Sequence, residues 1–256
     1  MTAFGREKLL RAKEIAEAHG YTLLHALTDA VWVQQPDVSE EGLAALCREI
    51  TRATGVTMEL EGRYRWVAFL PSKVRADLPA ATRYFGVFSD GTWKARGLAY
   101  RRHDVPVFVQ RTQLAMLGVL AEAADLAGVA ARLPQAIEVV RESWGQLATG
   151  RIPQVQLLVT KTVSHAPEAY QVDTATALAL RQLADVGLHL HPGERVRYLI
   201  RQAKASSKEE RVRAYPRLGP DDAVDGRAYQ ALLLDAALEL LTPFGYDAAR
   251  LRGALR

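Results

Sequence analysis

The residues Leu27-Thr28-Asp29 form a tight turn between two apolar, β-prone stretches, and they carry one carboxylate where chemistry would need two. Two carboxylates on a rigid turn can hold a pair of metal ions about 3.5–4 Å apart, which aligns a hydroxyl with a phosphoryl group for transfer. Leucine offers no lone pair, whereas Mg²⁺ requires oxygen ligands in octahedral geometry. The turn therefore predicts no metal site, and we expect Asp29 to cap local amides.

Basic residues gather in two segments of a chain whose formal net charge is only +4. Residues 94–111 hold five Lys or Arg and one acid, and residues 194–217 hold eight and three. Locally clustered Lys and Arg are typical of surfaces that contact phosphates. Two ordinary solvated faces are the alternative interpretation.

The hydrophobic periodicity of the first part predicts the elements that position these residues. Asp37 and Glu40 have the spacing of a capping box, and Asp90-Gly91 indicates a hairpin turn because this pair tolerates positive φ at both central positions. The expected elements are a helix over 6–18, a hairpin over 21–33, a helix from about 37 to 53, and strands over 56–70 and 84–98. This order is typical of an antiparallel sheet with helices on one side.

From residue 107 onward the sequence becomes rich in Ala and Leu with helical spacing. The expected helices cover 107–126, 134–148, 174–186, 226–241 and 247–255, with short β-prone stretches at 154–162 and 194–200. We place the boundary between the two regions near Gln110. The predicted fold class is α+β, an antiparallel sheet with helices followed by a mostly helical region.

Composition excludes several classes of protein. With 256 residues, 49% hydrophobic and 24% charged, the chain matches a folded soluble protein. It has neither a secretory leader nor an apolar run of eighteen residues, so we expect a cytoplasmic protein with no membrane association. Cys47 is the only cysteine, which excludes an internal disulfide, and we expect it to be buried.

Six segments in consistent order resemble the end of the palm and the thumb of B-family DNA polymerases. The first is Thr2 to Arg6 with Gly20 and His25 to Ala30, which resembles a helix beginning T-x-x-G-R followed by Y-G-D-T-D-S. The others are Arg83-Tyr84 (K-K-R-Y), Arg96 to Asp104 (R-G-L-x-x-x-R-R-D), Leu158 to Lys161 with Pro167 to Tyr170 (L-x-x-x-K and P-x-x-Y), Gly187 to Tyr198 (G-x-x-x-x-P-G-x-x-V-x-Y), and Tyr229 to Tyr246. The resemblance thus covers nearly the whole chain.

The resemblance implies that residues 1–110 are the C-terminal part of a palm and residues 111–256 a thumb. It implies that primer–template duplex DNA is bound by Arg83, Tyr84, Arg102, Lys161, Arg195, Arg197 and Arg201. Two departures weaken the pattern. Leu27 replaces the first acid of D-T-D, which in the family binds both metals, and Ala81 and Thr82 replace two lysines.

We therefore expect a degenerate or split B-family polymerase fragment that is inactive alone, binds duplex DNA and/or completes a partner chain carrying the N-terminal half of a polymerase. It needs no cofactor, and Mg²⁺ enters only if that partner restores an active site. Two alternatives stay open: the thumb-bearing subunit of an active split polymerase, and a protein-binding scaffold without DNA binding. Replication and repair roles are both compatible with these residues.

Overall fold

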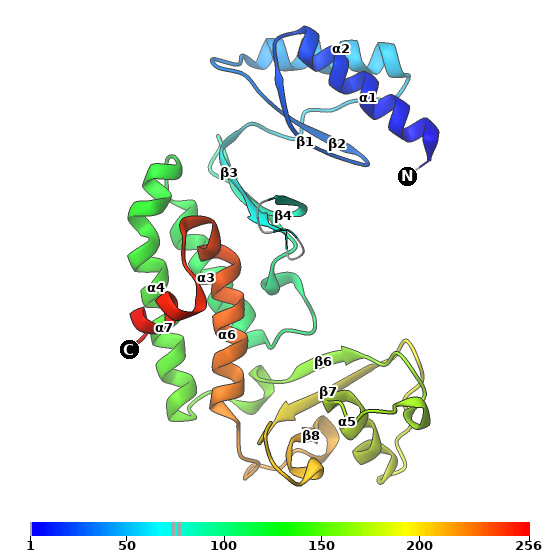
Figure 1. Ribbon diagram of the computed structural model, residues 1–256, viewed down its shortest axis with the longest axis vertical. Coiled ribbons are helices and arrows are strands. Elements are labelled where there is room, and N and C mark those ends of the chain that lie inside the picture. Colours follow the sequence, from blue (N-terminus) through cyan, green and yellow to red (C-terminus); the bar gives the residue numbers. More distant parts are fainter. Residues whose placement is uncertain (1, 73–74, 76–77) are drawn as a thin grey trace.

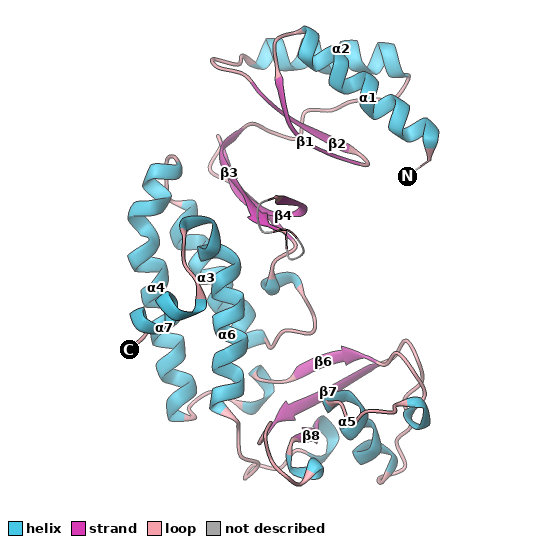
Figure 2. Ribbon diagram, in the orientation of Figure 1, coloured by secondary structure: helices cyan, strands magenta, loops and turns pink. Residues whose placement is uncertain are grey.

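The computed structural model describes residues 2–72, 75 and 78–256 as a mixture of helices and small antiparallel sheets (Figures 1 and 2). Its first elements are α1 (Ala3–Ala18), β1 (Thr22–Leu27), β2 (Ala30–Gln34), α2 (Glu40–Thr54), β3 (Tyr64–Pro71), β4 (Pro79–Phe88) and β5 (Trp93–Arg96). Then follow η1 (Ala99–Arg101), α3 (Val107–Ala121), α4 (Leu126–Thr149), β6 (Val159–Thr162), α5 (Ala175–Ala184), β7 (Arg195–Ile200), β8 (Val212–Ala214), α6 (Gly226–Leu241) and α7 (Ala248–Ala254). The mixed α+β class is confirmed.

The N-terminal unit consists of α1, the β1–β2 hairpin and α2. Helix α2 begins at Glu40, two residues after the start that a cap at Asp37 would give, because Ser39 rather than Asp37 is the cap and its side chain accepts a hydrogen bond from Gly42 N. Gly55, at φ 69°, ends the helix in the left-handed conformation that glycine adopts without strain. Cys47 is only half-buried, contrary to expectation.

The middle sheet has the strand order β3-β4-β5. Its β4–β5 turn has positive φ at Gly91 alone, so the expectation of two such residues is wrong for Asp90. Asp90 instead accepts hydrogen bonds from the backbone N and the Oγ1 of Thr92, at 2.8 and 2.7 Å. The strand predicted over 56–70 begins only at Tyr64, and residues 57–63 form neither helix nor strand.

Helices α3, α4 and α6 pack side by side, and the short helix α7 contacts α6 (Figure 1). Helix α4 begins at Leu126, eight residues before the predicted start at Pro134, and Pro134 lies inside it. The side chain of Asp125 accepts a 2.7 Å hydrogen bond from Gly128 N and so caps this earlier start. The prediction placed Pro134 in the first turn of the helix, but the cap at Asp125 sets the start of the helix.

A third sheet, with the order β6-β7-β8, lies beyond the helices and packs against α5 (Figure 2). Strand β8 was not predicted, because its three residues are too short to show alternation. The second region is therefore less helical than expected.

The hydrophobic core of the described residues consists of two clusters. One cluster joins α1, α2 and Tyr21, and a second runs from Trp66 to Leu255. Gln110 lies within α3, whose Val109 packs in the same cluster as Trp66. Among the described residues, no helix combines the length and the apolar surface needed to cross a bilayer.

Candidate nucleic-acid interface

The hairpin tip presents Leu27 and Asp29 as the sequence predicts. Strands β1 and β2 pair up to Leu27 and Ala30, which leaves Thr28 and Asp29 as the exposed turn. Within the described part of the chain, no group of three or more His, Cys, Asp or Glu side chains could hold a metal ion. The residues present therefore do not fit a pair of Mg²⁺ ions, which need several oxygen ligands held together.

Tyr84 lies in the core rather than at a surface. Its side chain is fully buried, with ring centroids 5.7 Å from Trp32 and 5.6 Å from Phe69. His25 completes this aromatic group at 5.0 Å from Trp32. The placement corrects the expectation that Tyr84 contacts DNA, because its ring instead anchors the β1–β2 hairpin on the middle sheet.

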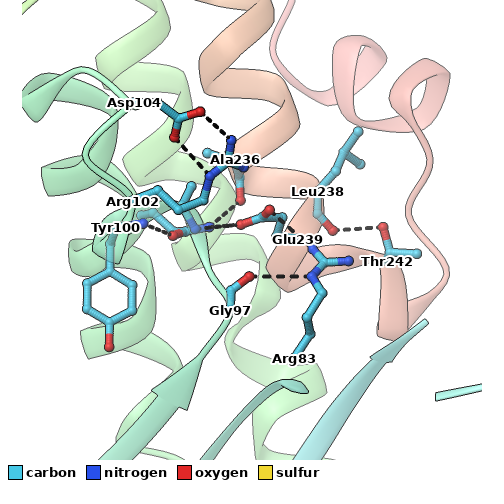
Figure 3. Close-up of polar contacts among 11 residues, drawn as sticks. Arg83, Gly97, Tyr100, Arg102, Asp104, Ala236, Leu238, Glu239 and Thr242 are labelled. Carbon is cyan, nitrogen blue, oxygen red and sulfur yellow. Dashed lines mark hydrogen bonds and ion pairs between the residues drawn. The ribbon is translucent and has the colours of Figure 1, made fainter. Parts of the chain in front are cut away.

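Arg83 also points inward, into a polar network shown in Figure 3. Its Nη2 lies 3.1 Å from Glu239 Oε1 on α6, and both side chains are less than a fifth exposed. The other oxygen of Glu239 accepts hydrogen bonds from Ala99 N at 2.7 Å and Gln113 Nε2 at 3.0 Å. Gln113 Oε1 accepts from Tyr100 N at 2.7 Å. This network ties β4, η1, α3 and α6 together, so Arg83 has a structural partner where a phosphate contact was expected.

Arg102 and Lys161 converge on one carboxylate, that of Asp104. Arg102 donates two hydrogen bonds of 3.0 Å to the two oxygens, as Figure 3 shows, and Lys161 Nζ lies 2.7 Å from Oδ2. Partial burial would raise the pKa of Asp104, but the hydrogen bonds from Arg102 and Lys161 lower it to about 2. The two cations remain partly exposed and leave a net charge of +1 at this site.

The third sheet separates the predicted thumb cations onto two faces. In the β6–β7 pair Thr162 lies opposite Arg195 and Thr160 opposite Arg197, and opposed residues share a face. Lys161 lies opposite the buried Val196, on the other face. Arg195 and Arg197 are both exposed. The alternation therefore places two guanidinium groups and two threonine hydroxyls on one outward face, and directs Lys161 toward Asp104.

Tyr215 extends this outward face, and sequence reasoning did not identify it. The guanidinium of Arg197 lies 4.2 Å from the centre of its ring, which is a cation–π contact. Tyr215 follows β8, whose short length hid it from pattern analysis. We call Arg195, Arg197, Thr160, Thr162 and Tyr215 the basic face.

Other cations of the basic segment are engaged by acids. Arg201, expected at the interface, pairs with Asp222 at 3.0 Å and is about four-fifths buried, and Arg213 pairs with the same carboxylate. Burial opposes ionisation of Asp222, but hydrogen bonds from Gly219 N and Arg213 hold its pKa below the ordinary value. Arg217 pairs with Asp185, and Lys208 with Asp173. At least four of the eight cations in residues 194–217 are thus paired with acids of the same chain.

Comparison with known proteins gives consistent matches. The family model of DNA polymerase family B matches residues 78–243. The DNA polymerase of Archaeoglobus fulgidus is 20% identical over 99% of this chain and 32% of its own length. DNA polymerase 2 of Aeropyrum pernix is 24% identical over 100% of this chain and 30% of its own length. The chain therefore spans about a third of the length of these relatives.

A solved structure shows the same fold. The family B DNA polymerase from Pyrobaculum calidifontis superposes with a TM-score of 0.64 at 21% identity, over 96% of this chain and 30% of that one. Nearly every element described above therefore has a counterpart in a single solved chain.

Proposed function

The chain belongs to DNA polymerase family B, and we propose that it serves there as a non-catalytic palm and thumb element. Residues 1–110 correspond in this proposal to the C-terminal part of a palm, and residues 111–256 to a thumb. In this proposal the element binds primer–template duplex DNA and completes a polymerase core.

The apolar side chain of Leu27 at the hairpin tip supports the non-catalytic part of the proposal. Two-metal phosphoryl transfer needs carboxylates that bridge the ions, and Leu27 stands where the family pattern has the bridging acid. Asp29 alone supplies too few oxygen ligands to hold Mg²⁺ against its hydration shell. In this proposal nucleotidyl transfer depends on metal-binding acids outside residues 1–256.

The basic face supports the DNA-binding part, and it is the observation that carries the proposal. Arg195 and Arg197 are two residues apart on β7, so their Cα atoms lie about 7 Å apart along the strand, close to the spacing of successive phosphates on one DNA strand. Thr160 and Thr162 add hydroxyl donors beside them. Both arginines are exposed, unlike Arg83 and Arg201.

A salt titration of duplex binding tests this proposal directly. We expect the affinity of the chain for a fluorescent 20-base-pair duplex to fall log-linearly as NaCl rises, because bound phosphates release counterions. The chain with Arg52→Gln, an exposed cation of α2, serves as a control for the loss of one positive charge outside the basic face. An absence of binding at low ionic strength would leave only the scaffold alternative.

A further inference from the structure

Three aspartates in the described part of the chain each pair with two cations: Asp104, Asp173 and Asp222. The site around Asp222 is enclosed, because its carboxylate is 9% exposed and both of its arginines are at most a quarter exposed. The two cations around Asp173 both belong to the unit of the third sheet. The site around Asp104 differs from these two because it joins two regions: Arg102 follows η1, and Lys161 lies on β6.

The two cations of the Asp104 site are open to solvent although both are paired. The side chain of Arg102 is 46% exposed and that of Lys161 is 41% exposed. Arg102 Nε, Arg102 Nη2 and Lys161 Nζ donate three hydrogen bonds to the two oxygens of one carboxylate. The oxygens of a phosphate accept the same two-pronged arrangement from a guanidinium group. The carboxylate of Asp104 therefore occupies a place that two phosphate oxygens fit.

The Asp104 site lies next to the basic face in the sheet. Lys161 lies between Thr160 and Thr162, which belong to that face. In the sheets that the structure describes, β6 pairs with β7 alone and is an edge strand. A lysine carries its charge on a flexible four-carbon stem, so on an edge strand the ammonium group reaches past the sheet. A duplex on the basic face would thus bring phosphates near Lys161.

We propose that the carboxylate of Asp104 competes with DNA phosphate for Arg102 and Lys161, and so lowers the affinity of the chain for duplex DNA. The inference rests on the proposed function and adds an autoinhibitory contact to it. In the free chain the carboxylate neutralises one of the two positive charges. In the complex a phosphate takes its place on both cations, and the carboxylate turns to water.

The exposure of the site favours this exchange. A partly exposed ion pair contributes little to stability, because water screens both charges. A phosphate contact also releases counterions from the duplex, which the intramolecular pair does not. The enclosed Asp222 offers no such exchange, because its second oxygen also accepts a hydrogen bond of 2.8 Å from Gly219 N.

Duplex affinities of the natural chain, Asp104→Asn and Asp173→Asn test the inference. Asparagine keeps the shape of the side chain and removes its charge. At about 50 mM NaCl we expect Asp104→Asn to bind the duplex about fivefold more tightly, with a salt slope that is steeper by about 1. Asp173→Asn also removes an acid that pairs with two cations, so it controls for net charge and should change the affinity by less than about twofold.

A second measurement uses the natural chain, so it does not depend on the folding of a variant. An amine-reactive ester labels Lys161 and Lys13, which are 41% and 39% exposed and are each paired with an acid. Duplex DNA at about ten times its Kd should slow the labelling of Lys161 by about tenfold. The labelling of Lys13, which lies on α1, should keep its rate.

The cation that is set free should account for the gain in affinity. Adding Lys161→Gln to Asp104→Asn should therefore remove most of the fivefold gain. The inference is overturned if Asp104→Asn binds no more tightly than the natural chain, if both aspartate variants gain equally, or if the duplex leaves Lys161 unprotected. In each of these cases salt-dependent binding by the natural chain still supports the proposed function, whereas an absence of binding by all the proteins overturns both.

Discussion

The strand pairs β1–β2 and β6–β7 have the same antiparallel architecture but differ in how much polar chemistry they retain. At the β1–β2 tip, metal binding would depend on an acidic side chain at position 27, and leucine occupies that position. On β6–β7, the cations that we propose for phosphate contact lie on an outward face. That face keeps Arg195 and Arg197 although Lys161 and Arg201 are held by acids. A metal site fails with a single substitution, whereas an electrostatic surface tolerates several.

The largest expected effect concerns the polar network around Glu239, which joins β4 and η1 to helices α3 and α6. Glu239→Ala leaves the largely buried Arg83 without an acidic partner and removes acceptors from Ala99 N and Gln113. We expect the free energy of unfolding to fall by about 3 kcal/mol, measured by urea denaturation. Glu142→Ala, an exposed position of α4, should change it by less than about 0.5 kcal/mol. Equal effects of the two variants would show that the network of Figure 3 adds nothing to stability.

The second largest expected effect is a loss of affinity for duplex DNA when the basic face loses its two arginines. The double variant Arg195→Gln, Arg197→Gln should weaken duplex binding at low salt by about tenfold or more and reduce the salt slope by about 2. The pair Lys208→Gln, Arg217→Gln removes the same charge from the same segment, but both residues are already ion-paired. Fluorescence anisotropy should therefore show a smaller loss for this control. A larger loss would move the interface away from the basic face.

A smaller effect is expected at Asp104, where the two regions of the predicted palm and thumb meet. The pKa of Asp104 is about 2 in the folded chain and about 3.9 in the unfolded chain. Ionised Asp104 therefore stabilises the fold fully at pH values above the unfolded pKa, and this contribution is lost as pH falls toward the folded pKa. Asp104→Asn should cost on the order of 1 kcal/mol at pH 7. The difference between the two proteins should shrink as pH falls from 5 toward 3. A difference in unfolding free energy that is constant with pH would contradict the ion-pair account.

The smallest effect concerns Tyr215. Tyr215→Leu keeps an apolar side chain but removes the cation–π contact that orients Arg197. The loss of about 0.5–1 kcal/mol corresponds to a two- to fivefold weaker affinity for duplex DNA. The same substitution in the Arg197→Gln background should have no further effect on affinity. Additive losses would indicate that Tyr215 contacts DNA independently of Arg197.

Local patterns in the sequence predicted the elements well where a cap or a turn decides them. The helix over 226–241 and the turn at Thr28-Asp29 lie where periodicity placed them. The start of α4 was wrong because the cap at Asp125 outweighs the turn preference of Pro134. Strand β8 and the missing first half of the strand over 56–70 depend on long-range pairing, which alternation in one segment does not report.

The candidate site was predictable only in part, for a related reason. The pattern R-x-R on a strand places Arg195 and Arg197 on one face without any knowledge of the fold. Their accessibility, and the inward direction of Arg83 and Tyr84, depend on partners that lie far away in sequence. Charge clustering indicated a phosphate-binding region but could not separate Arg201, held by Asp222, from its exposed neighbours.

The central claim is that this chain holds DNA through the basic face and has no metal at the hairpin tip. The most direct measurement is duplex affinity with and without 5–10 mM Mg²⁺, about the usual assay range, at constant ionic strength. We expect Mg²⁺ to leave the affinity unchanged or to weaken it, because the ion competes with Arg195 and Arg197 for phosphates. Binding that Mg²⁺ tightens, and that Asp29→Asn returns to the metal-free value, would contradict the account.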